Sequence, residues 1–484
     1  MRRLLILFCF IIFAIANLPA QNLTSSLNST IDIDELENAQ WSGYAINLSS
    51  GEVLFNKNEN FGLAPASGLK VVTTSAALEI LGADYKYKTE IAFSGKIDNS
   101  GTLEGDLILL GGGDPTLGSD RVEGSLNLDE LYSIFIEKIK SAGIKKIKGN
   151  VIGYSGLLGT ETIPDNWFWV DMGNYYGAYP SGLTINDNLY YLVFEPGEKV
   201  GDITTIARTE PPIPLLSFDN YVTTGKVGSG DNAYIYNAPI QNNAVVRGTI
   251  PAGVDEFKIK GSMPDPGLFA ADYMVSSLKE KGIEVSGKGI VTSSRPEINK
   301  VIYTHVSPYI ADIVYYINKI SWNLYTEHLL RTIALEKGDA PTNSEGTKLI
   351  KDFLQKNNID VSGVELYDGC GLSRSNMVTT KMMCELLGYM SKSKNYEVFN
   401  KSLAVVGDPD DIGYYSRMGL GTLLEKNARI KSGLIERVRS FTGYLNNKSG
   451  ELIAFSFIAN NYSGSRRAVD KLHTQIMLKL AETE

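Results

Sequence analysis

Residues 64–81 form the stretch that decides the fold of this chain, and they read APASGLKVVTTSAALEIL. After Pro65 the apolar side chains recur at helical spacing, so we predict an amphipathic helix over residues 67–81. Ser67 lies in the first turn of this predicted helix, and Gly82 is a natural place for the helix to end. The apolar positions are Leu69, Val72, Ala76, Ala77 and Ile80.

The start of this helix also carries the groups needed for nucleophilic chemistry. Ser67 and Lys70 are three residues apart, so on a helix their side chains share one face. A serine hydroxyl is a poor nucleophile until a base takes its proton, and a lysine whose neutral form is stabilised by burial can be that base. Backbone N–H groups at the helix start suit a developing oxyanion. Ser-x-x-Lys also begins at Ser276 and Ser391, but only Ser67 follows a turn and opens an apolar helix.

The composition of the whole chain excludes several classes of protein. The 484 residues are 43% hydrophobic and 21% charged, which is typical of a folded protein of two or three domains and not of a disordered chain. A formal net charge of −9 argues against nucleic-acid binding through bulk electrostatics. The three histidines are far apart in sequence, which leaves little material for a histidine-rich metal site or a His-based triad. We expect no cofactor and no metal.

The first twenty residues are typical of a secretory signal peptide. Two arginines precede an apolar run over residues 4–16, and a cleavage site follows at Ala20. The run is short for a membrane-spanning helix, which needs about 20 apolar residues. We therefore expect a secreted protein of the periplasm or cell envelope. Cys370 and Cys384 could pair in an oxidising compartment, and the sequence leaves that question open.

A mixture of strands and helices is predicted at both ends of the chain, and a β-rich block interrupts it. Apolar runs around a Gly-bearing turn predict a β-hairpin over residues 41–55. A second hairpin over residues 440–459 precedes a closing helix at residues 465–480. Between the hairpins, residues 89–301 are predicted to be mostly strands, with one clear helix at residues 268–281. Further helices are predicted at residues 310–318, 324–336 and 347–357.

Two more short motifs follow Ser67 and Lys70 along the chain. Ser321-Trp-Asn323 lies between two predicted helices, and Lys431-Ser-Gly433 lies on a predicted edge strand that faces a cleft. Each pattern recurs elsewhere and is weak alone. The order Ser-x-x-Lys, Ser-x-Asn, Lys-Ser-Gly is that of penicillin-binding proteins and class A β-lactamases, with Trp replacing the usual Asp and Ser replacing the usual Thr.

Four longer stretches surround these motifs and span nearly all of the predicted mature chain. With them the chain resembles the low-molecular-mass class C penicillin-binding proteins, the D-alanyl-D-alanine carboxypeptidase/endopeptidase family (peptidase family S13). The stretches are Ala64-Pro-Ala-Ser67, Gly105-Asp-Leu-Ile-Leu-Leu-Gly-Gly-Gly-Asp-Pro115, Tyr175-Tyr-Gly-Ala-Tyr-Pro-Ser-Gly-Leu183 and Asp368-Gly-Cys-Gly-Leu-Ser-Arg-Ser-Asn376.

The resemblance implies a multi-domain α+β fold. Its catalytic part would be a penicillin-recognising serine transpeptidase-like/β-lactamase-like domain, in which helices flank a five-stranded antiparallel sheet. Nested β-rich inserted domains would fill the long interval between Lys70 and Ser321. The implied boundaries are residues 1–20 for the signal peptide, 21–88 and 302–484 for the catalytic domain, 89–190 and 262–301 for inserted domain II, and 191–261 for inserted domain III.

The resemblance also implies which residues do the chemistry. Ser67 would be the acylated nucleophile and Lys70 its general base. Ser321 would relay the proton to the departing amine. The backbone N–H groups of Ser67 and Leu434 would form the oxyanion hole.

A second set of residues would bind the substrate. Asn323 would hold the substrate amide, and Lys431 would supply positive charge for the terminal carboxylate. Ser432 would hydrogen-bond that carboxylate, within a binding stretch that continues through Gly433 and Leu434. Leu434 departs from the small or hydroxylated residue usual in the family, so only its backbone N–H is carried over.

The implied activity is that of a serine-type D-Ala-D-Ala carboxypeptidase, with D,D-endopeptidase action as a further activity. Its substrates would be peptidoglycan stem peptides ending in D-Ala-D-Ala, and β-lactams would be covalent inhibitors. One alternative is a β-lactamase, although no dedicated deacylation base is evident. Another is a non-catalytic penicillin-binding cell-wall protein, against which the complete motif set argues. The preferred diamino acid and the oligomeric state, with a homodimer as one option, stay open.

Overall fold

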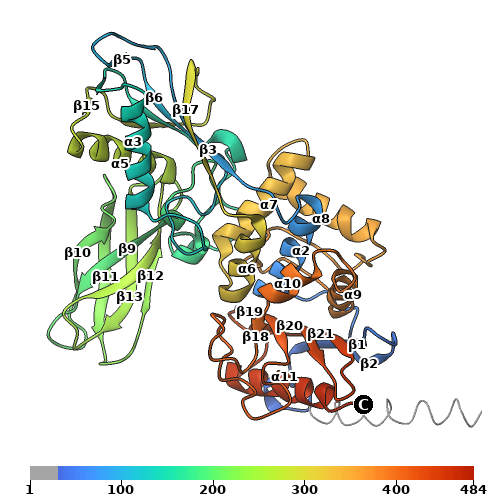
Figure 1. The fold of residues 1–484 in the computed structure, drawn as a ribbon. Coiled ribbons are helices and arrows are strands. Elements are labelled where there is room, and N and C mark those ends of the chain that lie inside the picture. Colours follow the sequence, from blue (N-terminus) through green and yellow to red (C-terminus); the bar gives the residue numbers. More distant parts are fainter. Residues whose placement is uncertain (1–30) are drawn as a thin grey trace, which may run out of the picture. The chain divides into compact units, whose positions relative to one another are not determined.

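The computed structural model describes residues 31–484, and Figure 1 shows the order of its helices and strands. The signal peptide predicted over residues 1–20 lies outside the described residues. Within the described chain, no helix combines the length and apolarity needed to cross a membrane. The chain divides into two compact units. Unit 1 comprises residues 31–76, Ile317–Ser321 and Ile350–Glu484, and unit 2 comprises Ala77–Tyr316 and Trp322–Leu349.

Unit 1 is built around an antiparallel sheet with the strand order β18-β19-β20-β21-β1-β2. Both predicted hairpins are confirmed, because β1 pairs with β2 and β20 pairs with β21. The strands are β1 (Gln40–Asn47), β2 (Val53–Lys57), β18 (Ala404–Val405), β19 (Arg429–Ile435), β20 (Val438–Asn446) and β21 (Leu452–Asn460).

The sheet differs from the expected five strands by the addition of β18. This two-residue strand pairs with β19 only at Arg429 and Ile430. The prediction of an edge strand at Lys431 therefore needs correction only for the two residues that precede it. Among the described strands, β19 is flanked on both sides at its first two residues and forms the sheet edge only from Lys431 onward.

Different helices cover the two faces of this sheet, because side chains alternate across it. On one face, Phe441 and Phe455 belong to the same buried cluster as apolar residues of α11 (Arg466–Ala481), the predicted closing helix. On the other face, the Tyr444 hydroxyl donates a 2.7 Å hydrogen bond to the Leu387 carbonyl oxygen of α9. Figure 1 shows α11 and α9 on either side of the strands. Helices α9 (Thr380–Met390) and α10 (Tyr396–Ser402) are absent from the predicted elements.

The three helices predicted between residues 310 and 357 are confirmed. They are α6 (Ile310–Ile320), α7 (Asn323–Lys337) and α8 (Asn343–Lys356).

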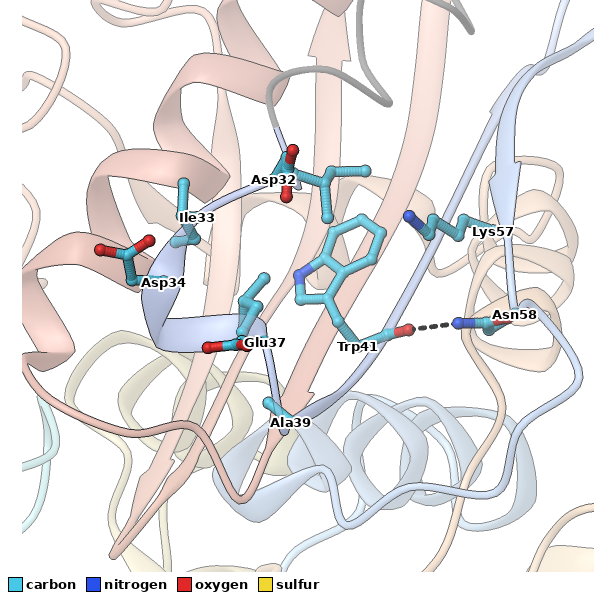
Figure 2. A pocket seen from close by; sticks show the side chains of 10 residues that line it. Asp32, Ile33, Asp34, Glu37, Ala39, Trp41, Lys57 and Asn58 are labelled. Carbon is cyan, nitrogen blue, oxygen red and sulfur yellow. Dashed lines mark hydrogen bonds between the residues drawn. The ribbon is translucent and has the colours of Figure 1, made fainter.

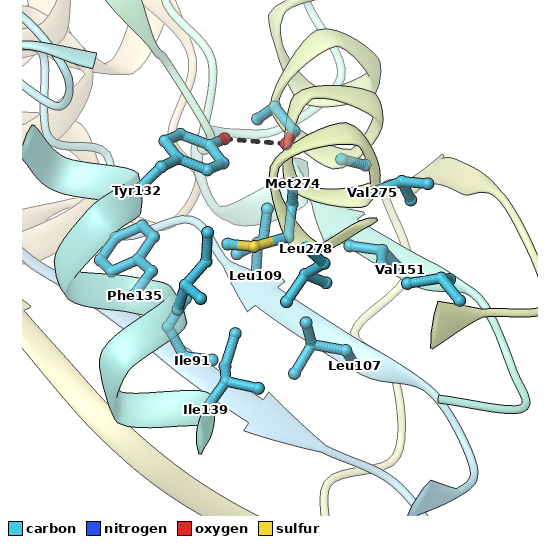
Figure 3. Close-up of a cluster of buried hydrophobic side chains, with 14 of the residues drawn as sticks. Ile91, Leu107, Leu109, Tyr132, Phe135, Ile139, Val151, Met274, Val275 and Leu278 are labelled. Carbon is cyan, nitrogen blue, oxygen red and sulfur yellow. Dashed lines mark hydrogen bonds between the residues drawn. The ribbon is translucent and has the colours of Figure 1, made fainter. Parts of the chain in front are cut away.

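The largest sheet of unit 2 has the order β16-β8-β6-β3-β17 and is covered by two helices. One is the predicted helix, α5 (Pro266–Glu280), and the other is α3 (Leu128–Ser141), so the prediction of one clear helix is corrected. Figure 3 shows Phe135 of α3 and Leu278 of α5 above the strands, around Leu107. The strands are β3 (Lys88–Phe93), β6 (Leu107–Leu110), β8 (Val151–Tyr154), β16 (Gly289–Thr292) and β17 (Lys300–Val306).

Three smaller sheets complete the strands of unit 2, with the orders β15-β7-β5-β4, β10-β9-β14 and β11-β13-β12. The strands of the last two sheets contribute side chains to a separate buried cluster, which includes Phe194 and Val246. The boundaries given above for inserted domains II and III stay a prediction. The strands are β4 (Lys96–Ile97), β5 (Thr102–Glu104), β7 (Lys146–Ile147), β9 (Leu189–Glu195), β10 (Thr205–Glu210), β11 (Ser217–Gly225), β12 (Asn232–Tyr236), β13 (Asn243–Pro251), β14 (Phe257–Ser262) and β15 (Glu284–Val285).

Candidate active site

Ser67 and Lys70 are in direct contact in unit 1. Ser67 lies in a 3-10 turn, η2 (Ala66–Leu69), and Lys70 is the first residue of α2 (Lys70–Ile80), so the single predicted helix is in fact a turn followed by a helix. The Lys70 Nζ donates a hydrogen bond of 2.9 Å to the Ser67 Oγ. It also donates one of 2.8 Å to the carbonyl oxygen of Cys370, and the lysine side chain is buried. The geometry is that of a serine beside the amine that could take its proton.

The backbone around Ser67 is held by close contacts with two other segments. Ala66 has a φ of +46°, in the left-handed region that non-glycine residues rarely adopt. The first segment is β19, where Gly433 lies so close that an added Cβ would be 2.2 Å from the Pro65 carbonyl oxygen. The second contains Gly371, where an added Cβ would be 1.9 Å from the Ala66 carbonyl oxygen. The glycine of the Lys-Ser-Gly motif is therefore required by packing, since it lets β19 lie directly against the turn that carries Ser67.

Ser321 lies at the end of α6 and is joined to the third motif. Its N–H donates to the Ile317 carbonyl oxygen at 2.8 Å, but its φ of +65° ends the helix there. The Ser321 Oγ accepts a hydrogen bond of 2.9 Å from the Nζ of Lys431. Strain of this kind, in a residue that is not glycine, is concentrated at functional sites.

Lys431 connects Ser321 to β19 and is itself buried. Besides Ser321, its Nζ donates to the Ser432 carbonyl oxygen at 3.0 Å. Burial lowers the pKa of Lys431 well below that of an ordinary lysine, and the positive charges of Lys70 and Arg439 lower it further. The two motif lysines are therefore near enough for one charge to act on the other.

Ser432 has partners that the sequence did not indicate. Its Oγ accepts a short hydrogen bond from the Tyr415 hydroxyl, and Tyr415 in turn accepts one of 3.3 Å from Arg439. Arg439 lies on β20, opposite Leu434, and is the one charged residue of that strand, which is a signal that the sequence offers. Nothing in the sequence marks Tyr415, which lies in the loop between β18 and β19. The Leu434 side chain is 42% exposed.

Asn323 and Trp322 belong to unit 2. The Asn323 side-chain amide donates a hydrogen bond of 2.8 Å to the carbonyl oxygen of Tyr176, within the resemblance stretch at residues 175–183. The Trp322 ring packs against Tyr175, and the Arg121 guanidinium lies 4.3 Å from its centroid. These contacts hold the Asn323 amide and the Trp322 ring in place.

A cavity in unit 1, of about 710 Å³, lies apart from this chemistry. Figure 2 shows Trp41 at its centre and the Asn58 amide donating to the Trp41 carbonyl oxygen at 2.9 Å. The described residues that line it include none of the predicted site residues. They are Ile31, Asp32, Ile33, Asp34, Leu36, Glu37, Ala39, Trp41, Lys57 and Asn58.

The remaining polar residues considered from the sequence are structural. Cys370 and Cys384 are buried as thiols and are not joined in a disulfide. His328 is buried, with its ring nitrogens hydrogen-bonded to the Gly113 carbonyl oxygen at 2.9 Å and to Thr184 at 2.8 Å. Burial lowers the pKa of His328 to about 3, so the ring is neutral at physiological pH. Ser276 and Lys279, which form another Ser-x-x-Lys, lie on the exposed side of α5.

The sheet, the flanking helices and the paired Ser-Lys contacts define a penicillin-recognising serine peptidase fold. The chain belongs to the D-Ala-D-Ala carboxypeptidase 3 (S13) family, whose model matches residues 23–482.

Individual relatives agree with this assignment. The chain is 28% identical over 473 residues to a D-alanyl-D-alanine carboxypeptidase of Actinomadura sp. (strain R39), covering 95% of this chain and 84% of the relative. Penicillin binding protein 4 (dacB) from Haemophilus influenzae has a similar structure, with a TM-score of 0.81 and 25% identity over 95% of this chain and 99% of that one. A second structure of the Haemophilus influenzae protein, with a TM-score of 0.76 and 24% identity over the same shares, is a complex with a β-lactam.

Proposed function

We propose that this chain is a serine D-Ala-D-Ala carboxypeptidase that acts on peptidoglycan stem peptides through an acyl-enzyme on Ser67, and that β-lactams acylate the same residue. The observation that carries the proposal is the 2.9 Å hydrogen bond between the Lys70 Nζ and the Ser67 Oγ. The 2.9 Å contact between Ser321 and Lys431 supports it, since it supplies a second hydroxyl and a second amine in the same unit.

In the proposed acylation step, the Ser67 Oγ attacks the carbonyl carbon of the penultimate D-Ala while Lys70, in its neutral form, takes the hydroxyl proton. The backbone N–H groups of Ser67 and Leu434 stabilise the oxyanion that forms. The C–N bond then breaks, and the leaving amine receives through Ser321 the proton that Lys70 took, which returns Lys70 to its neutral form. D-Ala departs, and water later hydrolyses the ester on Ser67.

The substrate's terminal carboxylate would lie at the free edge of β19. Among the described residues, Lys431 donates hydrogen bonds to Ser321 and to the Ser432 carbonyl oxygen, which leaves one of its three N–H groups for an anion. A carboxylate in this buried place would stabilise the protonated form of Lys431, because an opposite charge favours the charged amine.

Mass spectrometry of benzylpenicillin-treated protein tests the assignment of Ser67. We expect one covalent adduct, mapped to the peptide that contains Ser67, and no adduct in Ser67→Ala. Ser276→Ala, which removes the serine of another Ser-x-x-Lys, is the matched control and should label like the wild type. An adduct on another residue would refute the assignment.

A substrate assay separates the proposal from its alternatives. We expect release of D-Ala from a Lys–D-Ala–D-Ala peptide by the wild type and not by Ser67→Ala. Catalytic turnover of nitrocefin without D-Ala release would identify a β-lactamase. Stable acylation without either activity would identify a non-catalytic penicillin-binding protein. Cleavage of a cross-linked dimer of stem peptides would add D,D-endopeptidase action.

The proposed substrate also requires export, which the residues at the N-terminus support. We expect the mature protein in the cell envelope to begin at Gln21. N-terminal sequencing of the protein recovered from that compartment tests this, and a mature protein that retains Met1 would contradict it.

A further inference from the structure

A chain of hydrogen bonds leads from α11 to the hydroxyl of Ser432. The Arg439 Nε donates to the Asp470 carboxylate at 2.5 Å, and its Nη2 donates to the Tyr415 hydroxyl at 3.3 Å. The Tyr415 hydroxyl donates to the Ser432 Oγ. All of these residues belong to unit 1.

The chemistry of arginine decides which group donates and which accepts in these hydrogen bonds. A guanidinium has only donors, so Tyr415 can contact Arg439 only by accepting. The hydroxyl hydrogen of Tyr415 is then directed to the Ser432 Oγ. Because Ser432 accepts that bond, its own hydrogen is left to donate to another group.

The packing around Tyr415 and Arg439 holds both side chains in place. Arg439 is 4% exposed, and its guanidinium lies 4.5 Å from the Phe441 ring centroid. The Tyr415 ring meets the same Phe441 edge-on, with centroids 5.7 Å apart. The Tyr415 carbonyl oxygen accepts from the N–H of Gly407 at 2.9 Å, which fixes the loop.

We propose that Tyr415 is a positioning residue for substrate recognition, which orients the Ser432 hydroxyl so that its hydrogen points to the terminal carboxylate. This inference rests on the proposed function, because it assumes that the carboxylate lies beside Lys431 and Ser432. Leu434 has no hydroxyl, so Ser432 carries the only side-chain hydroxyl on β19, and the direction in which it donates decides whether it attracts or repels an anion.

The experiment compares acylation by benzylpenicillin and by its methyl ester, which lacks the negative charge. The measured quantity is the ratio of the two second-order acylation rates. In Tyr415→Phe we expect the free-acid rate to fall roughly fivefold, the size of one hydrogen bond, with the ester rate unchanged. The ratio does not depend on the folded fraction, because unfolded protein lowers both rates equally.

The neighbouring Tyr414 supplies a matched control, since Tyr414→Phe makes the same chemical change at a side chain that is 72% exposed. We expect that variant to keep the wild-type ratio. An unchanged ratio in Tyr415→Phe, or an equal loss on both compounds, would overturn the inference and leave the proposed function intact. A wild type that neither compound acylates would overturn both.

Two variants of Ser432 test whether Tyr415 acts through this residue. In Ser432→Ala, adding Tyr415→Phe should lower the ratio no further, and an additional fivefold loss would contradict the proposal. Ser432→Thr keeps a hydroxyl and is the matched control, because χ1 restriction places its oxygen but not its hydrogen. Adding Tyr415→Phe to Ser432→Thr should therefore still lower the ratio roughly fivefold, and an unchanged ratio in that pair would count against an orienting role.

Discussion

Gly371 lies so close to Ala66 that a Cβ on Gly371 would be 1.9 Å from the Ala66 carbonyl oxygen. Both residues have positive φ, +84° at Gly371 and +46° at Ala66. Ala66 directly precedes Ser67, and Gly371 directly follows Cys370, whose carbonyl oxygen accepts the hydrogen bond from Lys70. This contact therefore sets the backbone on which both Ser67 and its lysine depend.

Substituting Gly371 by alanine should damage the site more than an ordinary glycine substitution would. The new methyl group must displace the Ala66 carbonyl oxygen, and the positive φ adds a cost of about 1 kcal/mol. We expect at least ~2 kcal/mol loss in the free energy of unfolding, together with slower labelling by fluorescent penicillin. Gly51→Ala is the matched control, because Gly51 has a φ of +76° but no atom near its added Cβ. Equal behaviour of the two variants in denaturation and labelling would contradict this account.

Recognition of a free carboxylate should weaken as the pH rises, because Lys431 loses its charge earlier than an ordinary lysine. Burial and the charges of Lys70 and Arg439 lower the pKa of Lys431, so the amine is charged below that lowered pKa and neutral above it. The ratio of acylation rates for benzylpenicillin and its methyl ester should therefore fall as the pH rises through it. Dividing the rates cancels the pH dependence of the nucleophile itself.

Lys431→Arg is the control for this profile. A guanidinium stays charged throughout the accessible range, so the ratio should become independent of pH, although its absolute value will change with the new geometry. A wild-type ratio that stays flat over the whole pH range in which the protein remains folded would show that the charge of Lys431 does not recognise the carboxylate.

Asp114, which follows the run of three glycines, should make the protein less stable as the pH rises. Its Oδ1 accepts hydrogen bonds from the Thr116 N–H at 2.8 Å and hydroxyl at 2.7 Å, while its Oδ2 has no partner among the described residues. Burial raises the pKa of Asp114 to about 6. Between its unfolded pKa near 4 and the folded value, the folded state holds more protons, so the free energy of unfolding falls as the pH increases.

Asp114→Asn removes this titration. We expect the variant to gain stability relative to the wild type between pH 4 and pH 7, by roughly 3 kcal/mol, measured by denaturation at several pH values. Ser276→Ala removes no titratable group, so its profile should run parallel to that of the wild type. Parallel profiles for Asp114→Asn and the wild type would show that Asp114 stays ionised in the folded state.

The parts of the site that local patterns specify could be predicted from the sequence, and the parts that depend on strain or distant contacts could not. Ser67 and Lys70 are three residues apart in helical backbone, so their contact follows from this spacing alone. The positive φ of Ser321 could not be predicted from its residue type, because serine rarely adopts a positive φ. Tyr415 and Arg439 meet only because the loop before β19 folds back onto β20.

Helix α3 is a different case, because local patterns in the sequence do indicate it. Asn127 and Glu130 form a capping box, in which the Asn127 Oδ1 accepts from the Glu130 N–H at 3.0 Å and Glu130 accepts from the Asn127 N–H at 3.2 Å. Apolar residues then follow at helical spacing. They are Leu131, Tyr132, Phe135, Ile136 and Ile139.

The capping box gives the last prediction. Asn127→Ala leaves the first N–H groups of α3 without a partner and should cost about 1 kcal/mol in the free energy of unfolding, whereas Asn127→Asp keeps the cap and should cost little. Phe135→Ala, which empties part of the core beneath the same helix, should cost about 3–5 kcal/mol. Urea denaturation followed by circular dichroism measures all three. If Asn127→Ala and Asn127→Asp were equally destabilised, the start of α3 would be held by its packing on the sheet and not by its cap.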